Sequence, residues 1–385
     1  MKVAIVVPHI FMHQEILPKV IFSPGTLAID LAEGLAQEGV AVTLATPGPI
    51  TVRGAKNHTA DLSAFEAELA GRGDTYIELL KKHPLTFITL ARQVQAELIA
   101  DIYTRANQGE FDIVHIYTNE EDIALPFAKL CKKPVVFTHH DPFNFLVKYK
   151  AIFPKYKNLN WLSISQSQRK GMPKDTNWVG NIYHGLAPDM FKLSENPSGG
   201  YIAYLGRIIG PKGVHLAIQA VKLYNQQNPQ KTLQLKIAGK HYSGKKDQYW
   251  QEQVLPYING RDVEYVGFIK DIQEKQDFLG NAHALMIPSL FEEPFGMVMI
   301  EALACGTPII GLDSGAIPEV IKPNNTGIIV QKASEEPEII HNLATAIENI
   351  GIIDRKQCRA DFEARFTLQR MCQSHRAVYQ KLQDN

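Results

Sequence analysis

Residues 286–311 read MIPSLFEEPFGMVMIEALACGTPIIG, a pattern that predicts a strand, a loop, a helix and a second strand. The first strand, over residues 284–287, stops at a proline, and the helix begins near Phe295, with apolar residues at helical spacing and Gly306 closing it. The second strand, over 308–311, is expected to run parallel to the first because a helix connects the two. The stretch therefore predicts one unit of an α/β fold built on a parallel sheet.

The start of this predicted helix presents the free backbone N–H groups of Phe295, Gly296 and Met297, where an anion or a sugar hydroxyl can approach closely. Glu293 precedes the helix and Glu301 lies within it. Eight helical positions of about 1.5 Å each separate the two carboxylates by roughly 12 Å on one side, about the span from the sugar to the ribose of a nucleotide sugar. The alternative is that both are solvated glutamates near the positive end of the helix dipole.

Length and composition favour a soluble protein of two domains. The 385 residues are many for one core, and 45% hydrophobic with 21% charged residues is typical of an α/β protein. Because the formal net charge is zero, no global field favours nucleic acid as a partner. The four scattered cysteines have no metal-binding or disulfide spacing and fit a reducing compartment. With no signal-peptide core and no apolar stretch long enough for a bilayer, we expect a cytoplasmic location.

The first half of the chain reads as strands that alternate with helices. Its first strand, over 3–7, runs into a long loop and then a helix that opens at Gly25, where a glycine lets a phosphate approach the backbone. The motif Gly-x-Gly-x-x-Gly is absent, so a nicotinamide-binding site is not favoured. Residues 60–107 read as helical. Further strands are expected over 40–46, 111–117, 134–138, 161–165 and 178–183.

Two segments of this half are candidates for contact with other molecules. His139 and His140 follow the strand over 134–138, and side chains just beyond the carboxyl end of a parallel strand face the ligand crevice of such sheets. Residues 143–161 mix aromatic residues with lysines. We expect that segment to pack its aromatic rings inward with the lysines in water, and the alternative is a peripheral membrane contact.

The second half begins after residues 194–200, a polar tract of turn-forming residues that predicts a linker. An apolar strand then ends at Gly206, and Arg207 and Lys212 flank the loop that follows. Arginine offers a planar fork to phosphate oxygens and lysine a mobile point charge, so this loop is a candidate phosphate site. The alternative is a pair of ordinary exposed cations. Further strands are expected over 233–238 and 263–267, helices over 214–223 and 271–280, and a helical tail over 335–383.

Several of these motifs together resemble the donor site of family-4 retaining glycosyltransferases, also called group 1 glycosyltransferases. The match comprises Pro-Ser-Leu-Phe-Glu-Glu-Pro-Phe-Gly over 288–296, Glu-Ala-Leu-Ala-Cys-Gly-Thr-Pro over 301–308, and Gly-Arg, four residues, Lys-Gly over 206–213. The likeness covers both halves and is strongest over 201–330. The sequence departs from the family where Ala316 replaces the second glycine of a Gly-Gly-x-x-Glu motif. It departs again near Gly25, where relatives usually carry two glycines.

The resemblance implies the GT-B fold, in which two Rossmann-like, doubly wound parallel-sheet domains face a central cleft. We expect an acceptor domain over 1–195, a nucleotide-sugar donor domain over 201–365, and a last helix over 366–385 that crosses back to the first domain. It also implies that Glu293 contacts the donor sugar, that Glu301 contacts the ribose, and that His140, a better match to the family than His139, acts beside them. The catalytic candidates are His140, Arg207, Lys212 and Glu293. The donor-binding candidates are Gly25, Gly206, Arg207, Lys212, Gly239, Ile269, Glu293, Phe295, Gly296, Met297 and Glu301.

The implied reaction is transfer of a hexose from a nucleoside diphosphate sugar to an acceptor with retention of configuration. UDP-glucose or a similar donor is expected from family frequency, and the acceptor is not identified by the sequence. The wording around 140–142 and 183–185 faintly resembles bacterial pterin glucosyltransferases. No Asp-x-Asp occurs, so we expect no metal and no cofactor, with Arg207, Lys212 and a helix start neutralising the leaving diphosphate. A sugar phosphorylase, a nucleotide-sugar epimerase or a non-catalytic nucleotide-binding protein remain the alternatives.

Overall fold

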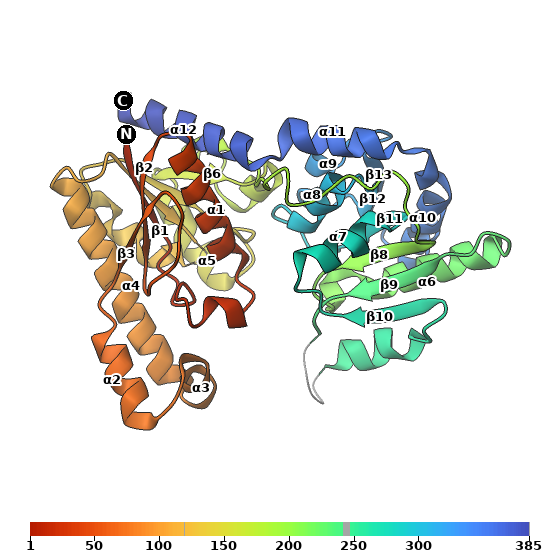
Figure 1. Ribbon diagram of the computed structural model, residues 1–385, viewed down its shortest axis with the longest axis horizontal. Coiled ribbons are helices and arrows are strands. Elements are labelled where there is room, and N and C mark those ends of the chain that lie inside the picture. The colour runs from red at the N-terminus through yellow and green to blue at the C-terminus, as the bar shows by residue number, and fades with distance from the viewer. Residues whose placement is uncertain (119, 242–246, 385) are drawn as a thin grey trace. The chain divides into compact units, whose positions relative to one another are not determined.

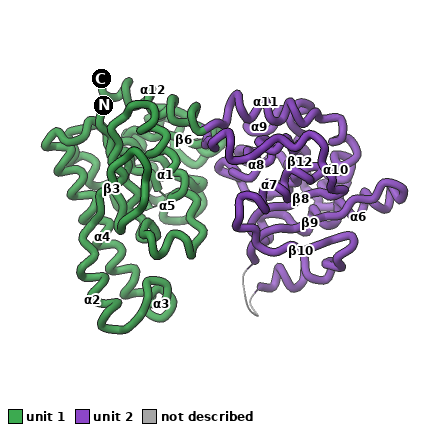
Figure 2. Tube along the Cα trace, in the orientation of Figure 1, with its two compact units in different colours: residues 1–182, 368–385 green, residues 183–367 purple. Residues whose placement is uncertain are grey.

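The chain folds into two compact units, each built on a parallel sheet (Figure 2). The computed structural model describes residues 1–118, 120–241 and 247–384. Unit 1 contains residues 1–182 and 368–385, and unit 2 contains residues 183–367. Each unit alternates strands with helices, as the sequence predicts (Figure 1).

The sheet of unit 1 has seven strands in the order β3-β2-β1-β4-β5-β6-β7. All of its pairings are parallel, and the order reverses between β1 and β4, the position at which doubly wound sheets bind ligands. The strands are β1 (Lys2–Val6), β2 (Ala41–Thr46), β3 (Lys56–Thr59), β4 (Ile113–Tyr117), β5 (Val135–Thr138), β6 (Asn160–Ser163) and β7 (Trp178–Asn181).

The helices of unit 1 are α1 (Ser23–Gln37), α2 (Ser63–Arg72), α3 (Tyr76–Lys82), α4 (Pro84–Asn107), α5 (Val147–Ile152) and α12 (Leu368–Asp384). The last of these comes from the end of the chain and packs against α1 (Figure 1). A Cβ atom at Gly34 of α1 would lie 2.5 Å from the Sγ of Cys372 in α12, so a residue without a side chain allows this close approach. Among the described residues, none of the helices combines the length and hydrophobicity needed to span a bilayer.

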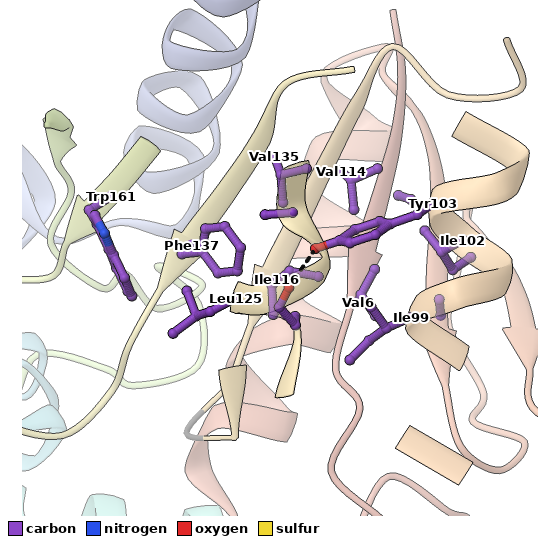
Figure 3. Close-up of a cluster of buried hydrophobic side chains, with 14 of the residues drawn as sticks. Val6, Ile99, Ile102, Tyr103, Val114, Ile116, Leu125, Val135, Phe137 and Trp161 are labelled. Carbon is purple, nitrogen blue, oxygen red and sulfur yellow. Dashed lines mark hydrogen bonds between the residues drawn. The ribbon is translucent and has the colours of Figure 1, made fainter. Parts of the chain in front are cut away.

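The core of unit 1 lies between β4, β5 and α4 (Figure 3). Its members include Tyr103, Ile116, Phe137 and Trp161, each at most 3% exposed. The hydroxyl of Tyr103 donates to the carbonyl oxygen of Ala124 at 3.5 Å, which gives this buried polar atom a partner. Strand β4 is buried along its whole length, so its sequence does not alternate between apolar residues facing the core and polar residues facing water.

The sheet of unit 2 has six parallel strands in the order β10-β9-β8-β11-β12-β13, and its order reverses between β8 and β11. The strands are β8 (Tyr201–Leu205), β9 (Gln234–Ala238), β10 (Val263–Gly267), β11 (Ala284–Ile287), β12 (Ile309–Leu312) and β13 (Gly327–Val330). The helices are α6 (Val214–Gln227), α7 (Ile272–Gly280), α8 (Met297–Ala304), α9 (Ile317–Val320), α10 (Glu336–Asn349) and α11 (Arg355–Arg365). Helix α6 packs against α10, and α8 packs against α11 and α7 (Figure 1).

The boundary between the units differs from the predicted one. The chain divides after Ile182, so residues 183–195 belong to unit 2 rather than to the first domain. The reason is local pairing: the N–H of Leu186 donates to the carbonyl oxygen of Phe366 at 2.9 Å, and a parallel bridge joins Leu186 to Thr367. The chain returns to unit 1 at Leu368, two residues after the predicted start of the last segment.

The predicted linker over 194–200 lies inside unit 2 and is held there by hydrogen bonds. The N–H of Ser194 donates to the carbonyl oxygen of Cys305 at 3.0 Å, and the N–H of Gly199 donates to that of Asn281 at 3.1 Å. This polar tract of turn-forming residues is therefore an ordered segment that leads into β8. Its composition alone did not predict these hydrogen-bond partners.

The aromatic segment over 143–161 is mixed in its exposure. Phe143, Tyr149 and Phe153 are buried, as predicted for a segment that packs its rings inward. Phe145 is 51% exposed, which differs from that prediction, and the neighbouring Val147 is 84% exposed. Peripheral membrane contact of this segment stays the alternative.

Candidate functional site

The loop that joins β8 to α6, residues 206–213, is shaped by a glycine with positive φ. Gly213 has φ +70°, and a Cβ atom there would overlap the carbonyl oxygen of Pro288 at the end of β11. The N–H groups of Leu290 and Phe291 donate to the carbonyl oxygen of Pro211 at 2.9 and 3.0 Å. The 206–213 loop is therefore fastened to the loop over 288–296, and the two loops carry the predicted phosphate and sugar residues.

Lys212 and Glu293 form the contact between these two loops. The Nζ of Lys212 lies 2.5 Å from the Oε1 of Glu293, and the two side chains are only 16% and 10% exposed. The hydroxyl of Ser289 donates to the same carboxylate oxygen at 2.8 Å. The Nζ of Lys212 also lies 4.8 Å from the ring centroid of Phe291. Glu293 is thus held in one orientation by two donors, one of them charged.

Arg207 is exposed and differs from Lys212 in its surroundings. Within the ranges that the structure describes, no carboxylate lies at ion-pair distance from its guanidinium. Its carbonyl oxygen accepts from the hydroxyl of Tyr204 at 2.8 Å, and burial raises the pKa of that hydroxyl well above its ordinary value, so Tyr204 remains a donor. The backbone of Arg207 is therefore anchored while its guanidinium is available to an anion.

The start of α8 is formed by Gly296, which has φ +94°. A Cβ atom there would lie 2.6 Å from the Cε of Met299 in the first turn of the helix. The preceding residue, Phe295, is 1% exposed and packs with ring-centroid distances of 5.1 Å to His184 and 5.9 Å to Tyr183. Helix α8 begins at Met297, two residues later than predicted. Because residues 293–296 precede the helix, the predicted separation of roughly 12 Å between Glu293 and Glu301 does not follow from helical rise alone, and it stays a prediction.

A tight turn at Gly315 holds the glutamate loop from the other side. Gly315 has φ +58°, and its N–H donates to the Oε2 of Glu292 at 2.8 Å, while a Cβ atom there would overlap the backbone of Glu293. The N–H of Ala316 donates to the carbonyl oxygen of Glu293 at 2.8 Å. Ala316 itself has φ −83°, an ordinary value, which explains why alanine is tolerated where the family motif has a second glycine.

Three further candidates lie at the carboxyl ends of β8, β9 and β10. A Cβ atom at Gly239 would overlap the carbonyl oxygen of Gly206, so these two glycines let neighbouring loops touch. The N–H of Gly206 donates to the carbonyl oxygen of Ala238 at 3.1 Å, and that of Gly239 donates to Gly267 at 2.8 Å. Ile269 follows β10 and is half-buried. All three therefore stand on the sheet edge that carries the 206–213 and 288–296 loops.

Glu301 is the last candidate in unit 2, and its partner was not predicted. The Nζ of Lys275 in α7 lies 2.8 Å from the Oε1 of Glu301, and the side chains are 25% and 12% exposed. The sequence offered no signal for this pairing, because the residues are 26 positions apart on different helices. Polar residues of this region that were not among the predicted site residues include Ser289, Glu292 and Lys275.

His140 and Gly25 lie in unit 1. His140 is 8% exposed and contacts the ring of Tyr117 edge-on, with centroids 4.3 Å apart. His139 is fully buried among aromatic rings, 4.7 Å from Tyr149 by centroid distance, so of the two histidines His139 has the surroundings of a core residue. The N–H of Gly25 donates to the carbonyl oxygen of Phe22 at 3.1 Å. A Cβ atom at Gly25 would lie 2.6 Å from the Sδ of Met12 and 2.7 Å from the ring of Phe22, so packing accounts for the glycine.

Comparison with protein families agrees with this arrangement. Residues 25–170 match the model described as Glycosyltransferase Family 4, and residues 187–361 match the model described as Glycosyl transferases group 1. Together with the two parallel-sheet units and the solved structures that share them, these family matches define a glycosyltransferase of the GT-B fold. The chain belongs to the family-4, group 1 glycosyltransferases.

The relatives in sequence share parts of the chain to different extents. Glycogen synthase of Mycobacterium tuberculosis (strain CDC 1551 / Oshkosh) is 32% identical over 149 residues, which cover 39% of this chain and 33% of the relative. The putative glycosyltransferase YtcC of Bacillus subtilis (strain 168) is 23% identical over 331 residues, 78% of this chain and 79% of the relative. D-inositol 3-phosphate glycosyltransferase of Pseudarthrobacter chlorophenolicus is 23% identical over 339 residues, which cover 78% of this chain and 76% of the relative. The match thus spans a third of the glycogen synthase and about three quarters of the other two.

Solved structures confirm the predicted GT-B fold. Sucrose-phosphate synthase from Thermosynechococcus elongatus superposes with a TM-score of 0.70 at 16% identity, covering 99% of each chain. Anabaena Alr3699/HepE in complex with UDP superposes with a TM-score of 0.68 at 17% identity, covering 99% of this chain and 100% of the other. At these identities the likeness concerns the fold.

Proposed function

We propose that this protein is a retaining, metal-independent hexosyltransferase that uses a nucleoside diphosphate hexose as its donor. The observation that carries the proposal is the Lys212–Glu293 pair of 2.5 Å, which joins a phosphate-type loop to a sugar-type loop. A cation and a carboxylate held together at the carboxyl edge of a parallel sheet suit a ligand that has a diphosphate next to a sugar. UDP-glucose is the preferred donor, in keeping with Anabaena Alr3699/HepE, whose structure is described in complex with UDP-glucose.

The two cations have complementary tasks in the proposed reaction. The guanidinium of Arg207 binds oxygens of the diphosphate, and Lys212 contributes a second charge while it keeps Glu293 in place. Negative charge develops on the diphosphate as the glycosidic bond breaks, so pre-placed cations and the start of α8 stabilise the transition state more than the ground state. This charge compensation is the reason to propose a reaction without a metal ion.

The carboxylates bind the two ends of the donor. Glu293 accepts hydrogen bonds from hydroxyls of the transferred sugar, and Glu301 accepts them from the ribose. The acceptor hydroxyl attacks the anomeric carbon from the side on which the diphosphate departs, and an oxygen of the departing phosphate takes its proton. The bond from the anomeric carbon to the phosphate oxygen breaks, a bond to the acceptor oxygen forms, and the configuration is retained. His140 is proposed to act on the acceptor side.

We also propose that the protein acts in the cytoplasm. The four cysteines are free thiols, which is in keeping with a reducing, cytoplasmic compartment.

The test is a thermal-shift screen of nucleoside diphosphate hexoses, followed by mass spectrometry of products formed from a metabolite extract. The anomeric configuration of the product is then read by NMR, and the reaction is repeated with EDTA. A product with inverted configuration, or a requirement for Mg²⁺ restored by adding the ion, would contradict the mechanism. Sugar phosphate formed from a glycoside and inorganic phosphate would identify a phosphorylase. Nucleotide binding with neither transfer nor donor hydrolysis would identify a non-catalytic binding protein.

A further inference from the structure

Each carboxylate of the proposed donor site has a lysine partner from a different segment of unit 2. Lys212 of the 206–213 loop pairs with Glu293, and Lys275 of α7 pairs with Glu301 of α8, with 2.8 Å between Nζ and Oε1. We propose that Lys275 is a positioning residue that holds Glu301 in the orientation in which it accepts hydrogen bonds from the ribose of the donor. This inference rests on the proposed function, which places the ribose at Glu301.

The surroundings of Glu301 make Lys275 its principal support. The Glu301 side chain is only 12% exposed, so water solvates its carboxylate poorly, and a largely buried charge needs a partner. The free N–H groups of α8 belong to its first turn, before Glu301, and therefore do not cap this side chain. Loss of the ammonium group would leave a poorly solvated carboxylate free to adopt other rotamers.

The geometry of the pair leaves room for a ligand. Lys275 donates to Oε1, and an ionised carboxylate offers about four acceptor positions on its two oxygens. The Oε2 of Glu301 therefore remains able to accept from a ribose hydroxyl while the lysine stays in place. A flexible side chain that must be ordered on binding reduces affinity, and a side chain ordered beforehand avoids that loss. Lys275 is thus expected to strengthen recognition of the ribose rather than to compete with it.

The alternative is that the Lys275–Glu301 ion pair has only a structural role and stabilises the packing of α7 against α8. Such a role would affect thermal stability but would not change how the protein distinguishes a ribose from a sugar without hydroxyls. The distinguishing quantity is therefore the ratio of the dissociation constants for 2′,3′-dideoxy-UDP and UDP. The two probes share base and phosphates, so changes elsewhere in the site cancel in this ratio.

Calorimetry with both probes on the full chain tests the proposal. The wild type is expected to prefer UDP by about ten- to a hundredfold, the range for hydrogen bonds to a charged group. Lys275→Met is expected to reduce this preference by about three- to tenfold, and Lys275→Arg is expected to restore most of it. Glu301→Gln is expected to reduce it as well, and the double variant with Lys275→Met is expected to lose little more.

Lys236→Met is the matched control. Lys236 also joins two elements of unit 2, with its Nζ 3.3 Å from the Oε2 of Glu264, but this pair lies between β9 and β10 and outside the proposed site. The preference for UDP is expected to be that of the wild type in this variant, even if its thermal midpoint falls.

The possible outcomes distinguish failure of the role proposed for Lys275 from failure of the proposed function. Wild-type preference in Lys275→Met together with a reduced preference in Glu301→Gln would overturn the role of Lys275 and leave the proposed function standing. A higher preference in Lys275→Met would mean that the lysine competes with the ribose, which also overturns the proposal. No preference for UDP in the wild type would remove the ribose from Glu301 and with it the donor assignment. Should Lys275→Met fail to fold, Lys275→Gln replaces it under the same criteria.

Discussion

A Cβ atom at Gly213 would overlap the carbonyl oxygen of Pro288 and lie 3.0 Å from its carbonyl carbon. This glycine, with φ +70°, is what allows the 206–213 loop to lie against the end of β11. The proposed donor site therefore depends on a residue that carries no chemistry of its own.

Replacing Gly213 by alanine is accordingly expected to damage both stability and nucleotide binding. The strained backbone and the collision with Pro288 are expected to cost about 2–3 kcal/mol, or roughly a 5–10 °C lower thermal midpoint for unit 2. Gly210→Ala is the control, because a Cβ atom there meets only the ring of Tyr249, at an ordinary 3.7 Å. Equal thermal midpoints in the two variants, measured by calorimetry, would contradict the packing argument.

The second prediction concerns the two cations of the same loop. Arg207→Ala and Lys212→Ala are each expected to weaken binding of UDP by roughly ten- to a hundredfold, the range for hydrogen bonds between charged groups. Lys231→Ala, which removes an exposed lysine elsewhere in unit 2, is expected to bind UDP normally. Unchanged affinity in both loop variants by titration calorimetry would remove Arg207 and Lys212 from the phosphate site.

The third prediction separates the transferred sugar from the nucleotide. Glu293→Gln is expected to keep its affinity for UDP within a few-fold, because the proposed partner of Glu293 is on the hexose, and to reduce turnover with the sugar donor. The amide still accepts from Ser289, which lies 2.8 Å from the carboxylate oxygen, so the loop keeps part of its support. A loss of UDP affinity as large as that of Lys212→Ala would mean that Glu293 acts through Lys212 and not on the sugar.

Most strands of unit 2 are recognisable from the sequence, whereas an edge strand and a helix start are not. Five of the six strands of unit 2 were predicted within a residue or two, because continuous apolar runs bounded by glycine and proline are characteristic of a buried parallel sheet. Strand β13, Gly327–Val330, was not predicted. Strand β3 was missed, since Lys56–Thr59 is a polar segment at the sheet edge and has no apolar pattern. The start of α8 was placed too early, because Pro294 and Phe295 resemble a helix start although Gly296 adopts a positive φ.

The partners of the site residues were the least predictable part. Glu293 and Lys212 were each recognised from a local motif, but their contact joins positions 81 apart. Lys275 has no motif, and it reaches Glu301 only because α7 packs beside α8. Motifs identify residues whose chemistry is tied to a local backbone shape, whereas residues that support them are selected by packing between distant segments.

The fourth prediction concerns pH and unit 1. Burial lowers the pKa of His375 in α12 from 6.5 to about 4, so the folded protein holds this ring neutral while the unfolded chain binds a proton below about pH 6.5. Stability is therefore fully present above that pH and is lost as the pH falls toward 4. Burial lowers the pKa of the neighbouring His115 as well, which adds to the effect in the same direction.

His375→Phe removes one of the two histidines that bind a proton in the unfolded chain but stay neutral in the folded protein. The variant is expected to be less stable at neutral pH, because it loses the hydrogen bond between Nδ1 and the carbonyl oxygen of Met371. As the pH falls from 6 to 5, its free energy of unfolding is expected to fall less than that of the wild type. The difference expected for one proton is about 1.4 kcal/mol per pH unit. Urea unfolding followed by circular dichroism measures both slopes, with His83→Gln, an exposed position of unit 1, as control. Parallel slopes for His375→Phe and the wild type would show that His375 does not couple to folding.

The last prediction concerns His140, which follows β5 in unit 1 and stands edge-on to Tyr117 at 4.3 Å. If His140 acts on the acceptor side, His140→Ala is expected to bind UDP with wild-type affinity, because the charged side chains proposed to bind the diphosphate and the ribose are in unit 2. Transfer to the acceptor is expected to fall by about ten- to a thousandfold, on the order of 1.4–4 kcal/mol of barrier. His58→Ala is the control, since His58 is also in unit 1 but pairs with Asp101 on α4, 2.7 Å away. Single-turnover transfer and UDP calorimetry on the same preparations give both quantities. Wild-type transfer in His140→Ala would show that His140 has no part in the reaction, and a matching loss of UDP affinity would move its role from the acceptor to the donor.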